Sequence, residues 1–226
     1  MRYLVFLSFL LSGVSLIAQS PGGVSTNLEL WLKADVGVEK TGPAAASVGD
    51  NVLNWLDQSG NGNDFTNDLG SAPKYEENAG RFTIDFSSGS QYLRGVSVFS
   101  GTGARTMIMV IQPTSLTASS SNCAFQLAPN ESGGRGYGLF TELPGANSGL
   151  ACRVSGNRIM DHTTSTTLPT IFSVQNGASE NVSATEFYAN GSSITTQLKV
   201  GAAALNTSAL GCAIGGFLQA LTTFLK

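Results

Sequence analysis

A polar loop at residues 54–65, "NWLDQSGNGNDF", carries the side chains of this chain that are best suited to bind a metal ion. Side-chain oxygens recur at every second position, and Gly60 and Gly62 allow the positive φ that a tight curl requires. Calcium takes six to eight oxygen ligands in proteins. We therefore predict a calcium site with the ligands Asp57, Ser59, Asn61, Asn63 and Asp64.

The same loop also fits a purely structural interpretation. Asp57 and the asparagines can accept hydrogen bonds from nearby backbone N–H groups in Asx turns, while Trp55 packs in the core. An EF-hand is excluded, because the twelfth position would hold Asp68 instead of Glu and no helices flank the loop. The sequence leaves the calcium site and the structural turn open.

Acidic residues that could cleave a glycosidic bond are isolated from one another. A glycosidase needs two carboxylates that flank the scissile bond, and the strand motif E-x-D-x-x-E does not occur. The acids in predicted strands are Glu29, Asp85, Glu142 and Glu186. His162 follows Asp161, but the chain has no G-x-S-x-G nucleophile motif. We therefore predict a protein that is not an enzyme.

Aromatic residues are the candidates for ligand binding. Sugar sites combine an aromatic ring with amide and carboxylate hydrogen bonds. The candidate rings are Tyr92, Tyr137 and Tyr188. Alternation along a strand does not say which of these rings faces outward, and core packing is the favoured interpretation for each.

The elements that must position these residues are predicted to be β-strands. Short runs rich in β-branched and aromatic residues are separated by Gly, Ser, Asn and Pro, which is typical of an antiparallel sandwich or jelly roll. The runs lie at 28–34, 81–86, 91–99, 106–113, 123–128, 136–143, 150–155, 169–176, 184–190 and 212–217. Asn190 and Gly191 predict a hairpin turn between two extended segments.

The charge and the N-terminus limit the environment and the partners. Residues 1–18 join Arg2 to an uncharged apolar run and predict a secretory signal peptide, and no later stretch has the length of a membrane span. The formal net charge of −3 argues against nucleic acid or anionic lipid as partner. Charged residues are only 12% of the chain, so Ser, Thr, Asn and Gly must cover much of the surface. We expect a secreted or cell-surface protein.

Three cysteines leave the redox chemistry open. Cys123, Cys152 and Cys212 are widely spaced and form no C-x-x-C motif. One disulfide with one free thiol is allowed in an oxidising compartment, and three buried thiols that pack as small apolar side chains are equally compatible.

Several segments occur in an order that resembles a known family. They are "LELWLKADVGV", "VGDNVLNWLDQSGNGNDFT", "FSSGSQYL", "TMIMVIQP", "FYANG" and "AIGGF". Their order is similar to that in the concanavalin A-like, laminin G-like jelly-roll domains of secreted bacterial proteins. The resemblance implies an all-β fold of two antiparallel sheets that binds carbohydrate or extracellular matrix in adhesion, frequently with calcium at the rim, within a larger exported protein.

The resemblance also implies a domain organisation. Residues 19–27 would be a linker and residues 28–217 the jelly-roll domain. The family continues with a further long strand, whereas residues 218–226 read "LQALTTFLK", so this end is either an atypical replacement or a truncation. We expect a non-catalytic module that binds glycan or cell-surface polysaccharide. A glycosidase with diverged acids and a structural spacer of a larger adhesin are the alternatives.

Overall fold

The computed structural model describes residues 20–68, 70–86, 91–112, 122–128, 136–142, 151–154, 157–161, 168–200 and 204–215. In these residues the chain forms short strands and two 3-10 turns, η1 (Pro21–Gly23) and η2 (Val182–Ala184). The paired strands run antiparallel throughout. The predicted signal peptide and the segment 218–226 lie outside the described residues.

One layer of the fold is a four-stranded sheet with the order β15-β14-β13-β8. Its strands are β8 (Arg105–Ile111), β13 (Thr170–Asn176), β14 (Glu186–Ala189) and β15 (Ser192–Ile194). Buried and more exposed residues alternate along β13 from Thr170 to Asn176, as they do in a strand with one face against a core. The other face of this sheet is therefore available to solvent.

The turn between β14 and β15 confirms the predicted hairpin. Asn190 and Gly191 have φ angles of 48° and 80°, and Ala189 pairs with Ser192 on either side of them. Positive φ at both central residues gives a turn whose twist matches that of the flanking strands. This short connection fixes which residues of β14 and β15 lie side by side.

The second layer belongs to a long sheet of eleven strands in the order β16-β12-β11-β10-β9-β17-β7-β4-β3-β1-β2. Its first strands are β1 (Val38–Lys40), β2 (Ala44–Ala45), β3 (Asn54–Trp55), β4 (Phe65–Thr66) and β7 (Leu93–Gly95). The others are β9 (Asn122–Leu127), β10 (Tyr137–Glu142), β11 (Ala151–Val154), β12 (Asn157–Asp161), β16 (Thr196–Val200) and β17 (Cys212–Ile214). A separate hairpin joins β5 (Lys74–Asn78) to β6 (Arg81–Asp85).

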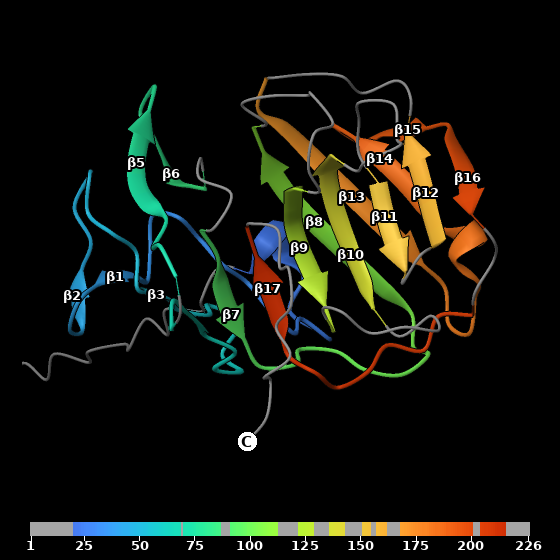
Figure 1. The fold of residues 1–226 in the computed structure, drawn as a ribbon, viewed down its shortest axis with the longest axis horizontal. Helices are drawn as coiled ribbons and strands as arrows, with labels where there is room; N and C mark the ends of the chain where they lie inside the picture. The colour runs from blue at the N-terminus through green and yellow to red at the C-terminus, as the bar shows by residue number, and fades with distance from the viewer. Residues whose placement is uncertain are drawn as a thin grey trace, which may run out of the picture.

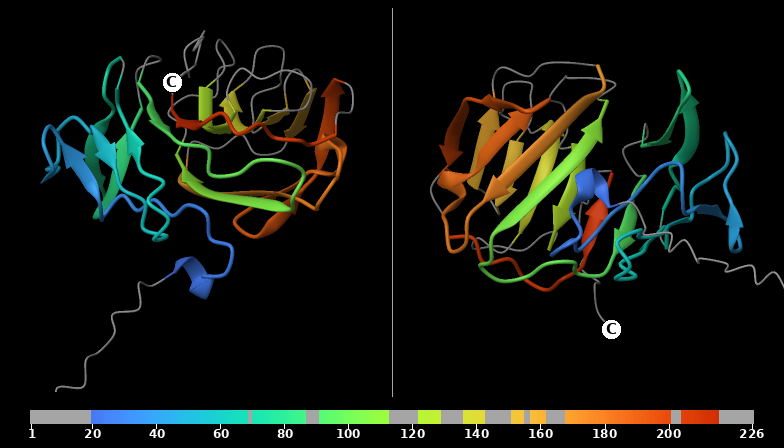
Figure 2. Two further views of the ribbon diagram at one scale, coloured as in Figure 1. Left: turned by 90° about the horizontal axis from the view of Figure 1, so that it is seen from below. Right: turned by 180° about the vertical axis from the view of Figure 1, so that it is seen from behind.

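The hydrophobic core lies between these layers. The four-stranded sheet lies behind β9 to β12, and the strands before β7 lie to one side with the β5–β6 hairpin (Figure 1). Figure 2 shows the two layers from below. Fully buried side chains enter from both: Tyr137 and Leu139 from β10, Phe172 from β13, and Phe187 from β14. Burying each large apolar side chain contributes about 1.5–3 kcal/mol, so these residues hold the layers together.

The prediction of a strand at residues 28–34 is wrong, because this segment forms no ladder with a neighbouring strand. Residues 28–32 belong to no strand, and Lys33 forms only an isolated bridge with Val36. The apolar residues that suggested a strand have a different role, because Leu30 and Leu32 both pack against the core from an extended segment. The backbone of this segment is bonded mainly to side chains of the loop that begins at Asp57.

Most of the other predicted strands are confirmed, and the all-β class of the fold with them. The predicted run at 106–113 corresponds to β8, and the runs at 123–128, 136–143 and 150–155 correspond to β9, β10 and β11. In β6 the Phe82 side chain is 43% exposed and stacks on Tyr75 with 5.4 Å between ring centroids. The antiparallel sheets are consistent with a sandwich, and the jelly-roll order stays a prediction.

Candidate functional site

The polar loop at residues 56–64 connects β3 to β4 in a hairpin. Trp55 pairs with Phe65 and Asn54 with Thr66, so the loop begins and ends at one edge of this two-stranded unit. Gly60 and Gly62 have φ angles of 93° and 72°, which confirms the positive φ predicted for both. The loop curls back over the extended segment that contains Leu28 and Trp31.

Asp57 is the centre of the hydrogen bonds in this loop. Its Oδ1 accepts from the backbone N–H groups of Trp31 and Ser59, both at 2.9 Å. Its Oδ2 accepts from the Ser59 hydroxyl at 2.6 Å and from the Asn63 backbone N–H at 3.0 Å. Asp64 acts in the same way, because its Oδ1 accepts from the Asp57 backbone N–H at 2.8 Å. Both Asp57 oxygens thus accept two protein donors each.

The asparagines of the loop direct their amide N–H groups at the extended segment. Asn61 Nδ2 donates to the Leu28 carbonyl at 2.7 Å, and Asn63 Nδ2 donates to the Glu29 carbonyl at 2.7 Å. The Gln58 backbone N–H donates to the Trp31 carbonyl at 2.7 Å. Side chains of the loop therefore take the place that a neighbouring strand would have beside residues 28–31.

The pKa of Asp57 reflects these bonds. Burial raises the pKa of its carboxyl, but the hydrogen bonds from the Ser59 hydroxyl and from three backbone N–H groups together hold it below its ordinary value. A carboxylate with several N–H donors stays ionised without a metal. The loop thus has the geometry of the structural turn. The calcium site at Asp57, Ser59, Asn61, Asn63 and Asp64 stays a prediction, and the described residues contain no group of three or more His, Cys, Asp or Glu that could hold a metal ion.

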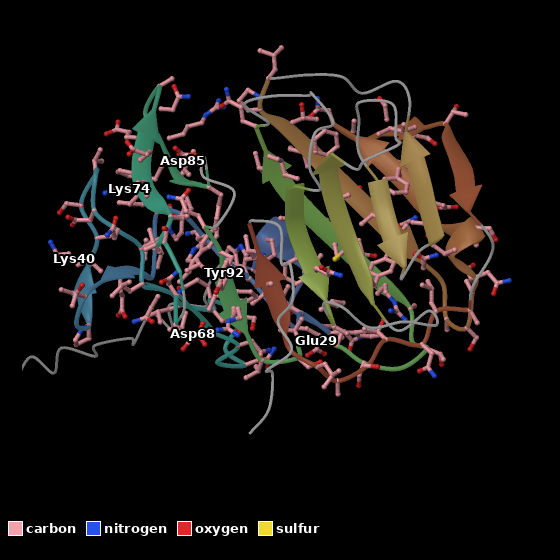
Figure 3. All side chains as sticks on the ribbon, in the orientation of Figure 1. Glu29, Lys40, Asp68, Lys74, Asp85 and Tyr92 are labelled. Atoms are coloured by element: carbon pink, nitrogen blue, oxygen red, sulfur yellow. The ribbon has the colours of Figure 1, made fainter. Side chains whose placement is uncertain are left out.

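The three candidate tyrosines occupy different environments. Tyr137 has no exposed surface, and its hydroxyl donates to Asn176 Oδ1 at 2.8 Å inside the core. A fully buried ring has no face to offer a sugar, so Tyr137 is a core residue in this conformation. Tyr92 is half-buried beside β7 (Figure 3), with the Arg94 guanidinium 5.6 Å from its ring centroid. Arg94 is in turn paired with Asp68 at 2.5 Å.

Tyr188 is half-buried and belongs to a polar cluster on the outer face of the four-stranded sheet. Its hydroxyl donates to Glu186 Oε2 at 2.9 Å. Gln175 Nε2 donates to the same carboxylate oxygen at 2.6 Å and to the Tyr188 hydroxyl at 3.4 Å. We call Gln175, Glu186 and Tyr188 the outer cluster. It combines an aromatic ring, an amide and a carboxylate on exposed strands.

Strand register explains how the outer cluster forms. Glu186 and Tyr188 are two residues apart on β14, so their side chains lie on one face of the sheet. Gln175 of β13 pairs directly with Glu186 of β14. Sequence reasoning identified Tyr188 but missed Gln175 and treated Glu186 as isolated. β13 and β14 are separated in the sequence by the connection 177–185. A local sequence pattern therefore could not predict which of their residues pair.

Apolar side chains lie beside the outer cluster on the same face. Ile108 and Val110 of β8 are 68% and 72% exposed, and Ile171 of β13 is 49% exposed. Ser173 joins the two parts, because it pairs with Ile108 on one side and with Tyr188 on the other. The outer face therefore presents a polar cluster and an adjacent apolar strip. The right view of Figure 2 shows the four-stranded sheet that carries them from behind. Such contiguous exposed apolar surface is typical of binding faces.

The carboxylates relevant to hydrolysis are on separate elements. Figure 3 shows Asp85 on the β5–β6 hairpin and Glu29 apart from it, at the lower edge of the molecule. Glu29 lines a shallow hollow of about 300 Å³ together with Ser97, Val98, Phe99, Ser100 and Ala209. Glu186 lies on the four-stranded sheet, and the side chain of Glu142 and residue His162 are outside the part of the chain that the structure describes.

The register of the long sheet separates the three cysteines. Cys123 lies on β9 and Cys152 on β11 with β10 between them, so their Cα atoms are roughly 9–10 Å apart. A disulfide needs Cα atoms within about 7 Å. Cys212 pairs with Leu127, well along β9 from Cys123. These backbone positions bring none of the three cysteines within that distance of another.

Cys212 itself is a buried thiol. Its Sγ donates to the Val96 carbonyl at 2.8 Å, and burial raises the pKa of the thiol to about 12. A thiol of this kind is not a nucleophile at neutral pH. Cys212 therefore packs as a small apolar residue.

The described residues form an all-β protein of antiparallel sheets whose four-stranded sheet has an outer face with polar and apolar parts. No described helix has the length and apolar character to cross a membrane. Comparisons of the chain with known protein families, with curated proteins and with solved structures find no match. The resemblance to concanavalin A-like and laminin G-like domains thus rests on the sequence segments alone and stays a prediction.

Proposed function

We propose that this chain is a secreted, non-catalytic module that binds carbohydrate or extracellular matrix through the outer face of its four-stranded sheet. The observation that carries the proposal is the outer cluster, in which Gln175 and Tyr188 fix the carboxylate of Glu186 on exposed strands. The apolar run at residues 1–18 supports secretion.

The chemistry of a sugar matches the two parts of this face. Sugar hydroxyls can form hydrogen bonds with the carboxylate and the amide, and the C–H face of a pyranose ring can pack on Tyr188 or on the neighbouring aliphatic side chains of Ile108 and Ile171. The cluster contains one carboxylate, and no second acid of the described residues acts on it, which supports binding over hydrolysis.

An array of immobilised glycans, probed with the purified chain, tests this proposal. We expect the wild type to retain at least one class of glycan and Tyr188→Ala to lose about ten-fold in affinity, in line with removal of a central aromatic contact. Phe82→Ala is the matched control, because Phe82 is another partly exposed aromatic residue, which stacks on Tyr75 in the β5–β6 hairpin instead of joining the outer cluster. Absence of glycan retention, or equal retention by Tyr188→Ala, would contradict the proposal.

A further inference from the structure

The donors of the outer cluster are used within the cluster itself. Gln175 Nε2 directs its bonds at Glu186 Oε2 and at the Tyr188 hydroxyl, and that hydroxyl donates its hydrogen to the same Glu186 oxygen. An amide nitrogen has two hydrogens and a phenol has one. A ligand at this site therefore meets few donors.

The atoms that remain for a ligand are acceptors. The hydrogen bonds to the Glu186 carboxylate converge on Oε2, and no donor in the described part of the chain reaches Oε1 of Glu186 or Oε1 of Gln175. Glu186 is fully exposed, so Oε1 can be approached from solvent. The orientation of the Gln175 amide follows from its carboxylate partner, because the reverse orientation would bring two acceptors together.

The charge of the surrounding face has one sign. The outward side chains of the described strands β8, β13, β14 and β15 are hydroxyl, aliphatic, aromatic and amide groups, with Glu186 as the charged member. A uronate or a sulfate would approach a carboxylate with no lysine or arginine beside it in this part of the face. Like charges that come together are unfavourable.

We infer that the outer cluster selects a glycan that is rich in hydrogen-bond donors and carries no negative charge, and that it binds an amino sugar with a free ammonium group in preference to its N-acetylated form. An ammonium group supplies three donors and a positive charge, both of which complement Glu186 Oε1. The inference rests on the proposed function, because it names the ligand class for the same site.

Isothermal titration with three sets of short oligosaccharides tests the inference on the full chain. The sets are glucosamine oligomers with free amines, N-acetylglucosamine oligomers and galacturonic acid oligomers, in mildly acidic, low-salt buffer. We expect the free amines to bind roughly five-fold more tightly than the acetylated oligomers, as an exposed charge pair allows. We expect the galacturonic acid oligomers to bind most weakly.

The variant Glu186→Gln tests whether the Glu186 carboxylate causes the preference for free amines. This substitution keeps the size of the side chain and removes its charge. The variant should therefore bind the free-amine and the acetylated oligomers with about equal affinity. Glu77→Gln on the β5 strand is the matched control, because it makes the same change of net charge on the other side of the molecule and should keep the preference. Added salt should reduce the preference in the wild type.

The outcomes separate the inference from the proposed function. Tighter binding of the galacturonic acid oligomers, or an unchanged preference in Glu186→Gln, would overturn the inference and leave glycan binding intact. If no oligosaccharide and no glycan on the array binds, both fail.

Discussion

Two polar regions of this molecule use similar side chains in opposite ways. In the loop from Asp57 to Asp64, the carboxylates and amides turn toward the backbone and hold residues 28–31 against the core. In the outer cluster, the side chains bond to one another and leave acceptor oxygens toward solvent. The first region is richer in the residues that bind metals and sugars, yet the second has more unused hydrogen-bonding capacity.

The difference shows that residue type alone does not indicate a binding site. A carboxylate whose oxygens each accept two protein donors, as in Asp57, contributes to stability. A carboxylate that is fixed through one oxygen and exposed at the other, as in Glu186, keeps an acceptor that faces solvent. Substitutions in the two regions should therefore affect different measurements.

The largest effect on stability is expected at Asp57. Asp57→Ala removes four hydrogen bonds to a half-buried carboxylate and leaves the Trp31 N–H without its acceptor. We expect the free energy of unfolding to fall by about 3 kcal/mol, measured by chemical denaturation. Asp64→Ala removes one such bond and should cost about 1 kcal/mol. Equal effects of the two substitutions would contradict the central role of Asp57.

Two tyrosines allow the comparison to be made with the same substitution. Tyr137→Phe removes a buried hydrogen bond to Asn176 and should lower the free energy of unfolding by about 1 kcal/mol without changing glycan affinity. Tyr188→Phe removes one of the two donors that hold Glu186, so it should weaken glycan binding a few-fold with little change in stability. Denaturation and titration of both variants measure this. The reverse assignment would show that the outer cluster is structural.

The pH dependence of binding should depend on Gln175. The pKa of Glu186 is lowered below its ordinary value of 4.5, mainly by the hydrogen bond from Gln175 and next by the hydrogen bond from Tyr188. The wild-type carboxylate therefore stays ionised as the pH falls through 4.5, and amino-sugar binding should persist there. Gln175→Ala should move the loss of binding to higher pH, toward the ordinary value. An unchanged pH profile of the titrations would show that Gln175 does not control the charge of Glu186.

The smallest effect is expected from calcium. Because both Asp57 oxygens already accept protein donors, we expect the melting temperature of the wild type to be the same with millimolar calcium and with a chelator. A melting temperature that calcium raises in the wild type but not in Asp57→Ala would instead support the predicted metal site.

Local patterns predicted the elements of this fold better than their partners. Asn190 and Gly191 identify a hairpin from two adjacent residues, because positive φ is a local requirement. The apolar run at residues 28–34 predicted a strand, and its side chains Leu30 and Leu32 do pack against the core. It did not reveal that loop side chains replace the neighbouring strand, because burial and hydrogen bonding are separate consequences of tertiary structure.

The candidate site shows the same limit. The spacing of Asp57, Ser59, Asn61 and Asn63 indicated a loop with converging side chains, but not whether they converge on a cation or on the backbone. Tyr137 and Tyr188 both lie in strands of similar composition, and only the packing of the layers places one in the core and the other on the surface. Gln175 joined the candidates through a cross-strand register that the sequence does not encode locally.

The position of β17 has a consequence for the order of folding during synthesis. This strand comes late in the chain, at Cys212–Ile214, yet it lies between β9 and β7 in the long sheet. Until the ribosome has released it, the strands from β1 to β7 and those from β9 to β12 have no ladder that joins them. The long sheet can therefore close only after Ile214 has been synthesised and released, and before that moment the free edges of β7 and β9 are open to chaperones or to other chains.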